Sequence, residues 1–173
     1  VPKPVLLDVG EHVPFRGEIH HIVEGEKGRA PVWADEEDGE PVILVSGKPE
    51  HAPRRIVDYL KREARKTLDA RTAFYADKLG IKPRRITVRD TASRWGSCSA
   101  QRSLSFSWRL ILAPDFVLDY VVAHEVAHMK EMNHSPRFWQ LVNMLGADVK
   151  RAQRWLADHG TMLHRYAPRI VVD

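Results

Sequence analysis

Residues 124–128 read His-Glu-Val-Ala-His, and a further histidine, His134, follows six residues after His128. On an α-helix, positions i and i+4 lie one above the other on the same face, so the imidazoles of His124 and His128 can bind one metal ion. Glu125 follows the first of these histidines directly and is expected beside the metal. The spacing therefore predicts two metal ligands and an adjacent carboxylate.

This arrangement suits hydrolysis by a metal-activated water. Zinc binds neutral imidazole, and a catalytic zinc has three protein ligands and one open position. The carboxylate of Glu125 can take a proton from the attacking water and later pass it to the leaving amine. H-E-x-x-H is the arrangement that zinc peptidases use, so we predict a Zn²⁺ site with Glu125 as catalytic base.

The alternative is a chance pattern, because the chain contains nine histidines. The helix expected over residues 114–132 is apolar nearly all round, which predicts a buried helix. Two histidines and a glutamate on a buried helix need polar partners, since unpaired buried groups are costly. A shared metal ion would satisfy all three, and this favours the metal site.

The third ligand has two candidates. His134 lies at the spacing expected of a third histidine ligand. Ser135 is a good N-cap and Pro136 fits the first position of a following helix, so His134 is expected in the corner between two helices. Glu131 is expected on the same helix face two turns beyond His124, where it is poorly placed to complete a tetrahedron. We therefore favour His134 over Glu131.

Length and composition limit the class of protein. The chain has 173 residues, of which 43% are hydrophobic and 29% charged, as expected for one globular domain or one domain with a small appendage. No apolar run is long enough to span a membrane, and residues 1–4 do not resemble a signal peptide. The single cysteine, Cys98, excludes an internal disulfide and predicts a reducing, cytoplasmic location.

The elements around the motif divide into a strand-rich part, residues 1–49, and a mixed part, residues 50–173. The first part should contain a hairpin of residues 31–34 and 41–45 joined by an acidic loop. In the second part we expect strands over 86–89 and 104–108, separated by a polar loop. Helices are expected over 53–79, 114–132, 136–145 and 148–159, with Gly80, Gly146 and Gly160 as stops.

The helix over 53–79 has two faces. Its apolar stripe comprises Ile56, Val57, Leu60, Ala64 and Leu68. The opposite face carries Arg54, Arg55, Lys61, Arg62, Arg65 and Lys66. Asp58 and Asp69 interleave with these cations, which favours a solvated face over a nucleic-acid surface. With a net charge of only +4, we expect at most weak, non-specific DNA binding.

Four motifs occur in one order at close spacing, over residues 94–99, 104–110, 120–128 and 133–139. Together they resemble the YgjP-like metallopeptidase family, metal-dependent hydrolases of the zincin class related to SprT-like proteins. The resemblance covers about residues 54–139. It implies His124, His128 and His134 as zinc ligands, Glu125 as the catalytic glutamate, and a small antiparallel sheet beside the active-site helix. Ser107 departs from the family pattern, where Asn is frequent.

The polar segment 94–98 is open to two interpretations. It either lines the rim of the cleft, with Arg94 or backbone N–H groups near the developing oxyanion, or it is a structural turn with Trp95 in the core. Cys98 is then a small buried hydrophobe, and its alternative role as an inhibitory metal ligand is less favoured. Tyr120 lies one turn before His124 and is expected to pack in the core.

We thus predict an α+β, zincin-like metallohydrolase, most simply a zinc metallopeptidase acting on a peptide or protein. The extended substrate is expected to pair with the strand 104–108. The alternatives are a DNA-associated SprT-like protease and a non-catalytic binding module with structural zinc. No feature of the sequence indicates an oligomeric state.

Overall fold

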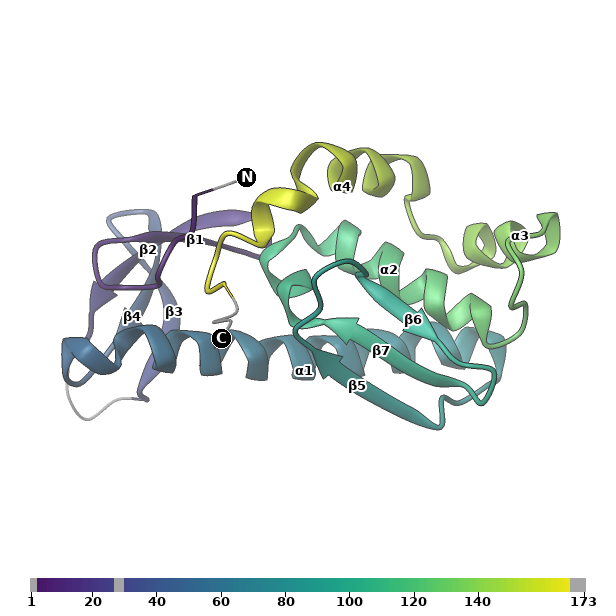
Figure 1. The fold of residues 1–173 in the computed structure, drawn as a ribbon, viewed down its shortest axis with the longest axis horizontal. Helices are drawn as coiled ribbons and strands as arrows, with labels where there is room; N and C mark the ends of the chain where they lie inside the picture. Colours follow the sequence, from purple (N-terminus) through teal and green to yellow (C-terminus); the bar gives the residue numbers. More distant parts are fainter. Residues whose placement is uncertain (1–2, 27–29, 169–173) are drawn as a thin grey trace, which may run out of the picture.

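The computed structural model describes residues 3–26 and 30–168 and has an α+β architecture, as predicted (Figure 1). Its first four strands form one sheet in the order β1-β2-β4-β3, and the next three form a second sheet in the order β5-β7-β6. The long helix α1 (Ala52–Leu79) runs along the N-terminal sheet and then behind the second sheet in Figure 1, and it connects the two. The start of the chain, residues 1–2, and the tail, residues 169–173, lie outside the described residues.

The N-terminal sheet confirms the strand-rich start. Its members are β1 (His12–Phe15), β2 (Glu18–Glu24), β3 (Val32–Glu37) and β4 (Glu40–Val45). The predicted hairpin is β3 and β4, but both strands continue into the stretch predicted as an acidic loop. Only Asp38 and Gly39 form the turn, both with positive φ, of 51° and 80°. The acidic side chains of this stretch are exposed, so extending the strands buries no charge.

Helix α1 follows the predicted pattern closely. Ile56, Leu60, Ala64 and Leu68 are all fully buried, which confirms the apolar stripe. Pro53 stands in the first turn, and Gly80 ends the helix in the left-handed conformation at φ 63°. The buried stripe packs against the 3-10 helix η2 (Trp108–Leu112) and helix α2 (Asp115–His128).

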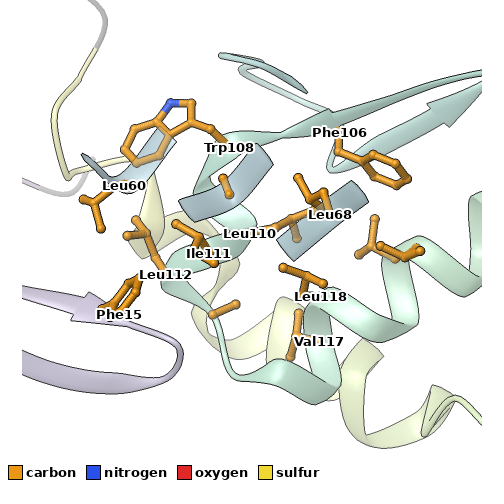
Figure 2. Close-up of a cluster of buried hydrophobic side chains, with 14 of the residues drawn as sticks. Phe15, Leu60, Leu68, Phe106, Trp108, Leu110, Ile111, Leu112, Val117 and Leu118 are labelled. Carbon is orange, nitrogen blue, oxygen red and sulfur yellow. The ribbon is translucent and has the colours of Figure 1, made fainter. Parts of the chain in front are cut away.

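The central core lies between α1, η2 and α2 (Figure 2). Trp108 and Leu110 to Leu112 are buried from the η2 side, and Val117 and Leu118 are buried from α2. Phe15 of the N-terminal sheet belongs to the same core cluster. Helix α2 is therefore held on its buried side by apolar contacts to two other elements.

The second sheet lies beside α2 and is mixed rather than wholly antiparallel. It comprises β5 (Arg85–Arg89), β6 (Gly96–Cys98) and β7 (Ser103–Ser107). Strand β5 pairs with β7 in parallel, and β6 pairs with β7 antiparallel. The expectation of an antiparallel sheet is wrong for the β5–β7 pair, and the short strand β6 falls within the predicted polar loop. Because β7 has a partner on each side, the edge strand next to α2 is β6 and not the strand over 104–108.

Two helix ends differ from the sequence prediction. Helix α2 ends at His128 instead of residue 132, and a loop leads to α3 (Pro136–Leu145). Helix α4 (Val149–Leu163) continues through Gly160, which was predicted as a stop. Gly160 is buried, and a Cβ there would lie 3.4 Å from the Trp95 ring. This glycine therefore stands inside the helix, where a Cβ would make ordinary contact with Trp95, and it is not a left-handed cap.

Arg109 links the C-terminal end of the described residues to the segment that follows β5. Its side chain is buried and pairs with Asp90, which follows β5. The same guanidinium donates to the backbone carbonyls of Tyr166 and Ala167 at 3.2 and 2.7 Å. Among the helices that the structure describes, none is long and apolar enough to cross a membrane.

Candidate metal centre

Helix α2 places His124 and His128 on one face, one turn apart. Their ring centroids lie 4.8 Å apart. The helix is buried nearly all round, as predicted; His128 is itself buried, and His124 is partly exposed. The i, i+4 spacing thus brings both rings to the side of α2 that borders a hollow.

His134 joins them from the loop between α2 and α3. Its Nε2 atom lies 3.0 Å from Nε2 of His128. Each of the three histidines offers a ring nitrogen, and these three nitrogens all lie within 4.8 Å of one another. The loop can return to the helix because Ser135 caps α3, its Oγ accepting a hydrogen bond from Phe138 N at 3.4 Å. The structure therefore brings together the three histidines that the sequence singled out.

The donor set suits a zinc ion. Two nitrogen ligands of a tetrahedral zinc, each about 2.0–2.1 Å from the ion, lie about 3.3 Å from each other. The 3.0 Å between the Nε2 atoms of His128 and His134 is close to that separation. Three imidazoles from one helix and the following loop also leave one tetrahedral position open.

A hydrogen bond to the backbone fixes the tautomer of the His128 imidazole. Its Nδ1 lies 3.0 Å from the carbonyl oxygen of Glu131, and a carbonyl can only accept, so Nδ1 carries the proton. The lone pair is therefore on Nε2, the atom that faces His134. Burial lowers the pKa of the His128 imidazole from its usual 6.5, which favours the neutral form that metals bind.

Glu131 occupies a different position from the one expected. Helix α2 ends before it, so Glu131 does not continue the helix face of His124. Its carboxylate lies 3.5 Å from Arg137, and it does not belong to the group formed by the three histidines. Glu131 thus contacts the site through its backbone carbonyl.

Two aromatic residues that the sequence reasoning left without a role enclose the histidines. The ring of Phe138 stacks on His128 at 4.3 Å between centroids. Trp139 lies 5.9 Å from His124 and 6.0 Å from His134. Both lie in the first turn of helix α3, and their position shortly after the predicted cap at Ser135 was the available signal. These rings restrict the orientation of the imidazoles.

Glu125 lies between His124 and strand β6. Its Oε2 is 3.0 Å from Nδ1 of His124, and its side chain is only 8% exposed. On the other side Gly96 approaches so closely that a Cβ there would lie 3.0 Å from Cγ of Glu125. A side chain on β6 would therefore compete with this carboxylate for space.

A hollow of about 350 Å³ opens beside these groups. Its lining combines the three histidines and Glu125 with Met132 and part of the segment 94–98. Strand β6 forms one wall, which agrees with the interpretation of this segment as a rim. Trp95 is half-buried against Gly160 and His164, so the same segment also has a structural part.

Cys98 and Tyr120 flank the site. Burial, together with the nearby charge of Glu125, raises the pKa of the Cys98 thiol to about 11, so the thiol is neutral at physiological pH. Cys98 lines the hollow but does not belong to the histidine group. Tyr120 is buried, as expected, and its hydroxyl accepts from Gln153 Nε2 at 3.2 Å.

The cations of α1 are largely engaged within the fold. Arg54 pairs with Asp58, and Arg65 pairs with Asp69 at 3.0 Å while also donating to the carbonyl of Ile86. DNA binding by this face remains a prediction.

Comparison with known proteins completes the description of the site. A family model described as YgjP-like, metallopeptidase domain, matches residues 2–159. No match was found among curated proteins. A crystal structure of the metallopeptidase zymogen abylysin from Pyrococcus abyssi superposes with a TM-score of 0.47 at 20% sequence identity, covering 57% of this chain and 97% of that one.

Proposed function

The chain belongs to the YgjP-like metallopeptidase family, and from this membership and the site geometry we propose that it is a zinc-dependent peptidase with Glu125 as general base. The observation that carries the proposal is the convergence of three histidine nitrogens within 4.8 Å beside a buried glutamate. His124, His128 and His134 would hold the ion. When bound, zinc polarises a carbonyl and lowers the pKa of a water molecule to about 7.

Glu125 has the position that a general base requires. Its carboxylate lines the same hollow as the three histidines. There it can take a proton from the attacking water, whose oxygen adds to the carbonyl carbon of the substrate. When the C–N bond breaks, Glu125 returns the proton to the leaving amine.

We propose that an extended substrate pairs with β6. Strand β7 is flanked by β5 and β6, so its backbone groups are already used within the sheet. Strand β6 is at the edge and forms a wall of the hollow with Gly96, Ser97 and Cys98. Backbone pairing there would lay a peptide beside the histidines.

A structural zinc site is the less favoured alternative. Such a site needs a fourth protein ligand. Within residues 3–26 and 30–168, the group of possible metal ligands consists of His124, His128 and His134 and includes no fourth residue.

We further propose that residues 50–173 carry the catalytic apparatus, and that residues 1–49 support it through the shared core.

The test is hydrolysis of a peptide library by zinc-loaded wild type and by Glu125→Gln. The variant should retain fold and zinc but lose about 10²–10⁴-fold in rate, because an amide cannot take the proton of water. Zinc content and circular dichroism serve as controls. Equal cleavage by both proteins would exclude Glu125 as the base, and no cleavage by a zinc-loaded wild type would contradict the peptidase proposal.

A further inference from the structure

The outer face of the second sheet carries only arginines and hydroxyl side chains along two of its strands. Ile86 and Val88 of β5 pack against the core, so Arg85, Thr87 and Arg89 point to the opposite side. The strand register aligns Thr87 with Ser105 of β7, and Ser105 with Ser97 of β6. In Figure 1 this sheet lies in front of α1, with the face away from α1 turned toward the viewer.

The arginines of this face are free to bind a ligand. Arg85 and Arg89 are exposed, and so is Arg94, which precedes β6. Over the part of the chain that the structure describes, no carboxylate pairs with any of the three. Arg65 and Arg109, by contrast, pair with Asp69 and Asp90. The three unpaired arginines therefore differ from arginines that serve the fold.

These groups border a hollow of about 490 Å³, a size typical of ligand sites. The described residues that line it include three arginines and seven serines or threonines, but no aspartate or glutamate. It meets the metal hollow at β6, because Arg94, Gly96, Ser97 and Cys98 line both. A chain bound at the histidines can thus continue onto the arginine face.

We propose that this face binds an acidic segment of the protein substrate, so that the enzyme selects sites flanked by aspartate or glutamate. Arg85 and Arg89 are four positions apart on one strand, or about 13 Å, which is also the separation of residues four positions apart in an extended peptide. Where acidic residues occupy alternate positions of such a peptide, every second one matches an arginine. Guanidinium and hydroxyl groups are the donors that carboxylates accept from. The proposal rests on the proposed function in taking the ligand to be a peptidase substrate.

A nucleic acid is a poorer match for this face. Single strands bind where bases can stack on exposed aromatic rings. Trp95 and Phe106 are the aromatic residues in the lining of this hollow. Phe106 is buried, and Trp95 packs against His164 and Gly160. Because Phe106 is buried and Trp95 packs against the fold, this face suits carboxylates on a peptide better than a single-stranded nucleic acid.

The experiment measures binding separately from cleavage. Fluorescein-labelled (Glu-Ser)₅ is titrated by fluorescence anisotropy with the zinc-loaded Glu125→Gln protein, next to (Gln-Ser)₅ and decathymidylate. The same titrations use Arg85→Gln/Arg89→Gln and a control of equal charge loss, Lys150→Gln/Arg154→Gln, whose residues are exposed on α4. We expect (Glu-Ser)₅ to bind at least tenfold more tightly than (Gln-Ser)₅, the β5 variant to lose about tenfold, and the α4 variant to lose less than twofold.

Thr87→Glu provides a second variant, since it places a carboxylate between the two arginines and should abolish the preference for (Glu-Ser)₅. Equal affinity for the acidic and neutral peptides would overturn the proposal, as would equal losses in the β5 and α4 variants. Tighter, Arg85- and Arg89-dependent binding of decathymidylate would assign the face to nucleic acid instead. If the protein without the arginine substitutions shows no acidic preference while the zinc-loaded wild type cleaves peptides, this proposal alone is rejected. Acidic preference without any cleavage by the wild type rejects only the proposed function.

Discussion

Gly96 and Glu125 are in such close contact that a Cβ atom at position 96 would lie 3.0 Å from Cγ and 3.2 Å from Oε2 of the glutamate. The same Cβ would lie 3.0 Å from Cγ1 of Val121, one turn earlier on α2. Strand β6 therefore rests directly on the helix that carries the motif. The absent side chain at position 96 lets the strand form a wall of the metal hollow without displacing the carboxylate.

Gly96→Ala should impair catalysis more than metal binding. The added methyl group must push Glu125 or β6 aside by a few tenths of an ångström, and misplaced catalytic groups lose rate steeply. We expect kcat/KM to fall about tenfold while zinc content stays unchanged. Steady-state kinetics on a cleaved peptide, with zinc quantified on the same samples, checks this.

Gly160→Ala is the matched control, because a Cβ there makes only ordinary contact with Trp95 at 3.4 Å and alanine favours the helix. Its activity should equal that of wild type. Equal activity in Gly96→Ala would show that Glu125 tolerates the methyl group and that the close contact has no catalytic consequence.

His134→Ala and Glu131→Gln should separate the two candidates for the third ligand. Removing an imidazole ligand should weaken zinc binding by at least about 100-fold, since even partners outside the ligand set contribute 10- to 100-fold. Glu131→Gln should leave zinc affinity unchanged, because the contact to His128 uses the backbone oxygen of residue 131. Competition with a zinc chelator measures both affinities, and a larger loss in Glu131→Gln would reverse the assignment.

Cys98 should be unreactive at neutral pH. Only the thiolate is nucleophilic, and a pKa raised from 9.0 to about 11 leaves very little thiolate at pH 8. Alkylation of the metal-free protein by iodoacetamide should therefore be slow at pH 8 and accelerate as the pH rises toward 11. Mass spectrometry over time gives the rates, with glutathione as the reference thiol. Rapid alkylation at pH 7 would contradict a buried neutral thiol and would reopen the role of Cys98 as a metal ligand.

Local patterns predicted much of this fold. The apolar stripe of α1 with Gly80 after it, and the cap at Ser135 before α3, are each specified by neighbouring residues, so their prediction is confirmed. The motif spacing likewise led to the three histidines that the structure brings together. Their roles as zinc ligands, and that of Glu125 as the base, remain to be tested.

Features that depend on contacts distant in sequence could not be predicted. Strand β6 has three residues and little strand propensity, and it forms because β7 and α2 lie on either side of it. Gly160 resembles a helix stop in the sequence, yet it is buried beneath Trp95, a residue 65 positions earlier. The parallel pairing of β5 with β7 likewise follows from the order of strands in space.

The most direct test of the metal centre is a crystal structure of the zinc-loaded protein with anomalous data collected on both sides of the zinc absorption edge. We predict a single zinc peak bound by ring nitrogens of His124, His128 and His134, each about 2.0–2.1 Å from the ion, with Glu125 beside the remaining position and not bound to the metal. A zinc ion coordinated by Glu131 or Cys98, or held away from His134, would contradict the account.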